Sequence, residues 1–71
     1  MLIEIMVITR DGLEVLTKVK DTTVLKEFYI PGGHRVGQYA LLNGRLSKTP
    51  ETEMLKAGDI VELCSLLAFA D

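Results

Sequence analysis

The sequence lacks tryptophan and has only one histidine and one cysteine among its 71 residues. The single cysteine, Cys64, excludes an intramolecular disulfide and predicts a reducing compartment. One cysteine and one histidine leave no cluster that would predict a metal site, and no cofactor is expected. Cys64 lies in an apolar run without a basic neighbour, so we interpret it as a small buried side chain rather than a reactive thiol.

Strong charge of either sign is missing too. The 8 basic and 10 acidic residues give a net charge of −2 and are scattered along the chain. Without a basic stripe to neutralise phosphates, we expect no nucleic-acid partner. The apolar start, Met1 to Ile8, contains Glu4 and is much shorter than the roughly 20 residues of a membrane span. It also lacks the basic region of a signal peptide, so we expect no membrane partner and a cytoplasmic protein.

Catalytic patterns are missing as well. No serine, histidine and aspartate arrangement and no phosphate loop occurs. The acidic residues are spread over predicted turns and strands, which does not favour an acid–base pair. We therefore expect that the protein is not an enzyme by itself. Its length predicts one domain over residues 1–71, and its 48% of hydrophobic residues supply a thin core.

The first half of the sequence predicts two strands joined by a hairpin. Residues 2–9 are rich in isoleucine and valine and apolar at nearly every position, which predicts a central strand buried on both faces. Asp11-Gly12 is a strong hairpin signal. Residues 13–20 then alternate, with Leu13, Val15, Thr17 and Val19 on one face and more polar residues on the other. This pattern is typical of a strand with one solvated face.

A short helix is predicted next. Residues 21–23 offer N-cap oxygens, and the segment 24–30 places Val24, Leu25 and Phe28 on one side of about two turns. Pro31 stops this helix, and Gly32-Gly33 lets the chain turn away. A helix this short is held by packing on a sheet rather than by its own propensity.

The second half predicts three further strands. Residues 36–42 form a strand ending at the turn dipeptide Asn43-Gly44, and residues 45–47 return from it. A loop over 48–57 is expected to place Met54 and Leu55 on the core, before a turn and a last strand over 60–66. This order predicts an α+β fold of the ubiquitin-like β-grasp kind: a mixed sheet of four to five strands with one short helix packed across it.

Two motifs carry a resemblance to a known family. Leu41-Leu42-Asn43-Gly44 and Gly58-Asp59-Ile60-Val61-Glu62 resemble the pattern of the ThiS/MoaD group, the small sulfur carriers of thiamine and molybdopterin synthesis. The resemblance covers essentially the whole chain in length and element order. It implies a protein partner: an adenylating or sulfur-transfer enzyme, or a synthase subunit. It also implies that the terminal carboxylate is converted to a thiocarboxylate.

The tail departs from this family. Carriers of the group end roughly in Pro-Pro-Val-Ala-Gly-Gly, whose diglycine threads a narrow channel to the activating site. Here Phe69-Ala70 occupies the diglycine positions and Asp71 adds one residue, which argues against carrier activity. Large apolar residues near a terminus either extend the last strand into the core or form a binding patch anchored by Phe69. The predicted partner-binding residues are Leu66, Leu67, Ala68, Phe69, Ala70 and Asp71.

His34 and Arg35 form the only adjacent histidine–arginine pair. They either contact an anion or ligand, or compensate the dipole at the end of the predicted helix. Residues 34–37, together with the Asn43 and Gly58 motifs, are also similar to TGS domains, ligand-sensing β-grasp modules of larger enzymes. Two hypotheses follow: a ThiS/MoaD-like protein that docks its sheet face and tail onto a partner, and a TGS-like regulatory or ligand-binding module. A true carrier with an unusual terminus is a third.

Overall fold

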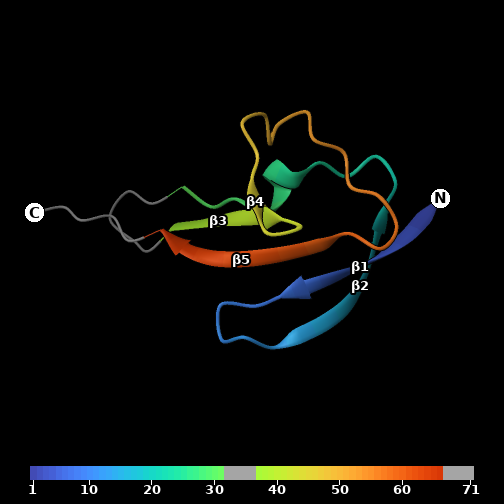
Figure 1. Cartoon of the computed structure of the whole chain (residues 1–71). Coiled ribbons are helices and arrows are strands. Elements are labelled where there is room, and N and C mark those ends of the chain that lie inside the picture. Colours follow the sequence, from blue (N-terminus) through green and yellow to red (C-terminus); the bar gives the residue numbers. More distant parts are fainter. Residues whose placement is uncertain (32–36, 67–71) are drawn as a thin grey trace, which may run out of the picture.

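Five strands form one mixed sheet in the order β2-β1-β5-β3-β4 (Figure 1). The computed structural model describes residues 1–31 and 37–66 of the chain. The strands are β1 (Leu2–Ile8), β2 (Glu14–Lys20), β3 (Gly37–Leu42), β4 (Arg45–Leu46) and β5 (Ile60–Leu66). The predicted mixed sheet is confirmed, and its topology is compatible with a β-grasp-like fold.

The parallel pair β1–β5 lies at the centre of the sheet and brings together the two strands nearest the chain ends. Its register runs from Met6 opposite Ile60 to Ile8 opposite Glu62. Strands β2 and β3 pair antiparallel on either side, with β1 and β5 respectively. The prediction that residues 2–9 form a central strand is therefore confirmed.

Both predicted hairpin turns are present. Gly12, with φ of +89°, follows Asp11 in the β1–β2 turn, where its amide donates to the Thr9 carbonyl at 2.9 Å. Asn43 and Gly44 both have positive φ, 51° and 81°, and reverse the chain between β3 and β4. Positive φ at both central residues is what a tight hairpin with the natural strand twist requires.

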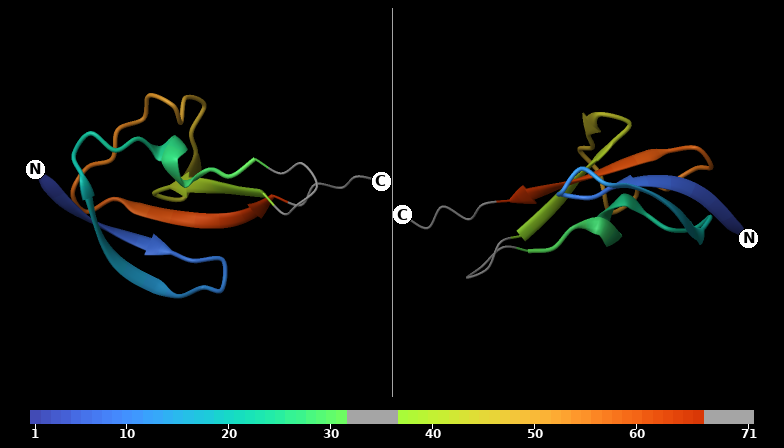
Figure 2. Two further views of the ribbon diagram at one scale, coloured as in Figure 1. Left: turned by 180° about the vertical axis from the view of Figure 1, so that it is seen from behind. Right: turned by 90° about the horizontal axis from the view of Figure 1, so that it is seen from below.

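The core lies between one face of the sheet and the segments that cross it. Odd-numbered residues of β1 and β5 and even-numbered residues of β3 point to this face. Figure 2 shows η1 and its flanking segments on one side of β1 and β5. The buried apolar cluster comprises Ile5, Val7, Leu25, Ala40, Leu55 and Val61.

The predicted helix over 24–30 is wrong in kind and length. The segment forms only a 3₁₀ helix, η1 (Leu25–Phe28), and no longer helix occurs in residues 1–31 and 37–66. The cause is the chain on both sides: Val24 bridges to Met54, and Ile30 bridges to Gln38. Both bridges need extended backbone, so only the five residues between Val24 and Ile30 remain, and Tyr29 among them is already extended. Leu25 is nevertheless fully buried, as its predicted place on the core requires.

Three smaller expectations are corrected. No side chain caps η1, because its N-cap position is Val24 rather than one of residues 21–23. Met54 is 55% exposed, whereas Leu55 beside it is buried, because adjacent residues of an extended segment point in opposite directions. Strand β1 is buried on one face only, since Leu2 and Glu4 are exposed.

Within the described residues, no helix is long and apolar enough to cross a membrane.

Candidate functional site

The face of the sheet opposite η1 carries rows of apolar side chains. The pairing register places Leu16, Met6 and Ile60 side by side across β2, β1 and β5. The next row crosses the whole sheet and reads Glu14, Ile8, Glu62, Leu41 and Leu46. We call the apolar members of these two rows the outer face: Met6, Ile8, Leu16, Leu41, Leu46 and Ile60.

Solvent reaches much of the outer face. Leu16 is 63% exposed, Leu46 is 65% exposed and Ile60 is 43% exposed. Single exposed apolar residues are normal on any protein, so exposure alone carries no conclusion. Here the register makes them neighbours of Met6, Ile8 and Leu41 on one face, and contiguous exposed apolar area usually marks a binding site.

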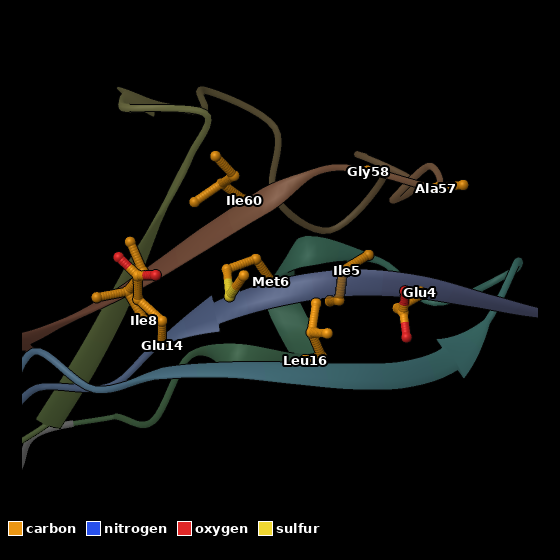
Figure 3. A pocket seen from close by; sticks show the side chains of 9 residues that line it. All are labelled: Glu4, Ile5, Met6, Ile8, Glu14, Leu16, Ala57, Gly58 and Ile60. Atoms are coloured by element: carbon orange, nitrogen blue, oxygen red, sulfur yellow. The ribbon is translucent and has the colours of Figure 1, made fainter.

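A groove of about 490 Å³ hollows this face along β1. Its walls come from the first three strands of the sheet order and from the turn before β5 (Figure 3). In the figure, Ile8 and Glu14 lie together at one end and Glu4 lies at the other. The lining residues are Glu4, Ile5, Met6, Ile8, Glu14, Leu16, Ala57, Gly58 and Ile60.

Carboxylates flank the apolar floor of the groove. Glu14 and Glu62 lie on the two strands beside Ile8, and Glu4 is opposite Lys18 on β2. Within the described residues the one ion pair joins the amino terminus to Asp21 at 3.8 Å. The groove thus combines an apolar floor with a carboxylate at one end, Glu14, and with Glu4 facing Lys18 at the other. A partner surface that is apolar at its centre and basic beside Glu14 would complement it.

The turn before β5 positions the groove. The Met6 amide donates to the Asp59 carbonyl, and the Gly58 amide donates to the Glu4 carbonyl, each at 2.9 Å. Gly58 has a φ of +87°, which a residue with a side chain adopts only at a cost. These bonds set the start of β5 beside β1 and bring Ile60 next to Met6.

Cys64 and Tyr39 are cross-strand neighbours on the same side of the sheet. Cys64 is half-buried rather than fully buried as predicted, because this face has no covering element among the described residues. The pKa of Tyr39 is raised above its usual value of 10, first by a side-chain hydrogen bond with Cys64 and next by the negative charge of the Cys64 thiolate. Burial and the nearby Glu62 add to the same direction.

Most of the predicted site residues lie outside the described residues. This holds for His34 and Arg35 and for the tail from Leu67 through Ala68, Phe69 and Ala70 to Asp71. The backbone of Leu66 ends β5, opposite Gly37. The predicted roles of these residues as partner, anion or ligand contacts therefore stay predictions.

A second hollow of about 390 Å³ lies beside η1, close in the chain to residues 32–36. It is lined by Lys26, Tyr29, Ile30, Pro31, Gln38 and Tyr39. Within residues 1–31 and 37–66, no group of three or more histidine, cysteine or acidic side chains could hold a metal ion.

Comparison with family models, curated proteins and solved structures found no match to this chain.

The alternation of β1 is the sequence signal for the outer face. Met6 and Ile8 alternate with the core residues Ile5 and Val7, so β1 is apolar on both sides. That pattern predicts burial on both faces, but in a sheet with one covered face it leaves Met6 and Ile8 half-buried, as part of an apolar strip on the uncovered side.

Proposed function

We propose that the protein is a small ThiS/MoaD-like docking protein that binds a protein partner through its outer face and its C-terminal residues. The observation that carries the proposal is the set of apolar side chains in two adjacent rows of the sheet, interspersed with Glu14 and Glu62, together with the groove along β1. Burying exposed apolar surface yields roughly 25 cal/mol for each Å², so such a face stabilises a complex once a partner covers it. The protein acts by binding and not by catalysis.

The ThiS/MoaD assignment is supported by sheet order and by the two sequence motifs. The strand order places the first and last strands side by side and parallel, as a β-grasp fold requires. The Asn43-Gly44 and Gly58-Asp59 dipeptides meet in space, where the side-chain amide of Asn43 donates to the Asp59 carboxylate at 3.2 Å. Two motifs whose bonded residues are 16 positions apart, and which form one hydrogen-bonded unit, support a relation at the level of the fold more strongly than either motif alone.

We propose that this protein docks without carrying sulfur. Phe69 and Ala70 stand where carriers of the resembled family have two glycines. A phenyl ring does not pass a channel shaped for bare backbone, whereas a large aromatic side chain is a common anchor at an interface. Phe69 therefore acts as an anchor of the docked tail.

The docking surface is tested by calorimetry, in which this protein is titrated into the adenylating enzyme of the same organism's thiamine or molybdopterin pathway and the dissociation constant is measured. Leu16 and Leu13 are a matched pair, since they are 63% and 64% exposed, and Leu13 precedes β2 and is not part of the outer face. Leu16→Ser is expected to weaken binding at least tenfold, and Leu13→Ser to leave it within about twofold. Equal losses in both variants would place the contact elsewhere.

Mass spectrometry tests the absence of sulfur transfer. The protein is incubated with the same adenylating enzyme, ATP and a sulfur donor, beside a variant in which Phe69 and Ala70 are glycine and Asp71 is deleted. We expect no mass change in the natural chain, and a gain of about 16 Da, oxygen replaced by sulfur, only in the variant. A thiocarboxylate on the natural chain would overturn this part of the proposal.

A TGS-like ligand-binding module is the second candidate. The hollow lined by Tyr29 and Pro31 favours it, because Pro31 precedes His34 and Arg35 by only three and four positions in the sequence. Pyrophosphate is a suitable anion probe. Amide shifts at Lys26 and Tyr29 that vanish in Arg35→Ala would favour this candidate, and unchanged spectra at millimolar probe would count against it.

A further inference from the structure

Strand β2 is an open edge of the sheet. It pairs with β1 on one side, and no strand of the described residues pairs with its other side. Seven residues long, it contains no proline, and its register with β1 runs without a bulge. In Figure 1 it is the outermost strand beside β1. An edge of this kind is a template for one more strand.

The hydrogen-bond pattern between β1 and β2 decides which residues of β2 direct their backbone amides and carbonyls to the open edge. At the two ends of the hairpin, the Asp21 amide donates to the Met1 carbonyl at 3.0 Å and the Thr9 amide donates to the Leu13 carbonyl at 2.8 Å. In an antiparallel pair, hydrogen-bonded and non-hydrogen-bonded positions alternate. Odd-numbered residues of β2 therefore bond to β1. The even-numbered residues, Glu14 to Lys20, direct their amides and carbonyls to the open side.

We propose that this edge pairs with β2 of a second copy of the chain, antiparallel and centred on Thr17. With Thr17 opposite its own counterpart, Leu16 faces Lys18 of the other copy and Glu14 faces Lys20. All four of these residues are even-numbered, so both pairs occupy hydrogen-bonded positions of the new contact. Every residue of the strand then has a partner.

The side chains are self-complementary in this register. The edge reads Glu14-Val15-Leu16-Thr17-Lys18-Val19-Lys20, acidic at one end and basic at the other. Antiparallel pairing places Glu14 opposite Lys20 twice, and Val15 opposite Val19 twice. Opposite charges and β-branched pairs directly across two strands stabilise a sheet. Lysines on an edge strand otherwise discourage pairing, so the edge favours a partner with an acidic residue at the matching position.

A copy of the same chain fits this edge better than a strand of arbitrary sequence. The two-fold axis stands perpendicular to the sheet, so the outer faces of both copies lie on the same side. The contact uses the edge of β2 and leaves Ile60 and Leu41 uncovered, which makes it distinct from the docking proposed above. The opposite edge of the sheet, β4, is only two residues long and offers no comparable template.

Sedimentation equilibrium between about 10 µM and 1 mM, under reducing conditions, tests the pairing. The natural chain is expected to shift from monomer towards dimer and to dissociate as salt rises, because the Glu14–Lys20 pairs are exposed. Glu14→Lys and Lys20→Glu should each weaken association at least tenfold. The double exchange, Glu14→Lys with Lys20→Glu, should restore it to within about threefold. Failure of the exchange to restore association, or a monomer throughout, would overturn the proposal.

Oxidative cross-linking tests the register, in a Cys64→Ser background. Thr17→Cys should form a disulfide dimer, because the central pair is a non-hydrogen-bonded one with the side chains about 5 Å apart. Val15→Cys is the matched control, since in this register its counterpart lies about 13 Å along the strand. Cross-linking of both at similar rates would contradict the register. Neither experiment requires the docking partner, so failure here is separate from failure of the proposed function.

Discussion

The side chain of Asn43 joins the end of β3 to the start of β5 through Asp59. Its amide nitrogen donates to one carboxylate oxygen of Asp59 at 3.2 Å, and its amide oxygen accepts from the Ile60 backbone at 2.9 Å. The other carboxylate oxygen of Asp59 accepts from the Lys56 amide at 2.7 Å. The two turns on either side of the 48–57 loop are therefore one hydrogen-bonded unit, which sets β5 beside β1 and so forms the groove.

Two substitutions of Asn43 separate the contribution of its side-chain hydrogen bonds from that of its positive φ. Asn43→Gly keeps the positive φ but removes the side-chain bonds, and we expect the free energy of unfolding to fall by about 1–2 kcal/mol. Asn43→Ala should cost roughly 1 kcal/mol more, because alanine is strained at that φ. Urea unfolding measures both. Equal stability of the two variants would show that the turn relaxes and that φ is not limiting.

Leu25 anchors η1 to the core. Since it is fully buried, Leu25→Ala should lower the free energy of unfolding by about 2–5 kcal/mol, through lost burial and a residual cavity. The free energy of unfolding of a small domain is only about 5–15 kcal/mol, so this loss is a large part of it. We therefore expect a largely unfolded variant with collapsed amide dispersion in NMR spectra. Lys26→Ala, on the exposed neighbour, should change stability by less than about 0.5 kcal/mol. A folded Leu25→Ala protein of natural stability would contradict this core.

Gln38 holds η1 to β3 by a buried hydrogen bond. Its side-chain amide donates to the Phe28 carbonyl at 2.6 Å. Gln38→Met keeps the length of the side chain but leaves that carbonyl without its donor, at a cost of about 1–3 kcal/mol. Amide hydrogen exchange should accelerate at Tyr29 and Ile30 more than in β1. Unchanged exchange at both residues would show that this bond contributes nothing to the η1 contact.

Tyr39 is predicted to titrate above pH 10, because Cys64 raises its pKa. A folded-state pKa above the unfolded value means that the protonated phenol favours folding. This contribution is present below pH 10 and is lost as pH rises through the folded pKa. Absorbance of phenolate near 295 nm follows the titration. Cys64→Ala should move the titration back towards 10, and an unchanged curve would contradict the pairing of these two side chains.

Strands and turns were predictable because their signals are local. Asp11-Gly12 and Asn43-Gly44 fix hairpins through backbone geometry, and the alternation over residues 13–20 fixes which residues share a face of β2. The helix was not predictable in the same way. Seven residues with apolar side chains at helical spacing do not distinguish one 3₁₀ turn from two α turns. The bridges of Val24 and Ile30 that limit it are contacts distant in sequence.

The outer face was the less predictable part of the candidate site. Sequence alternation shows that both sides of β1 are apolar, but only the arrangement of η1 shows which side stays uncovered. Met6 and Ile60 become neighbours through a parallel pairing between opposite ends of the chain. The sequence does predict a docking role for the sheet face and the tail. That role, including the part assigned to Phe69, remains a prediction.

Docking through the outer face is tested most directly by backbone NMR of this protein, labelled with ¹⁵N and deuterated, with and without the unlabelled adenylating enzyme bound to it. We predict that amide shifts or broadening concentrate at Met6, Leu16 and Ile60, and that Met6→Glu abolishes them while preserving the free spectrum. Shifts confined to the region around Tyr29 and Gln38, with the outer face unchanged, would contradict the account.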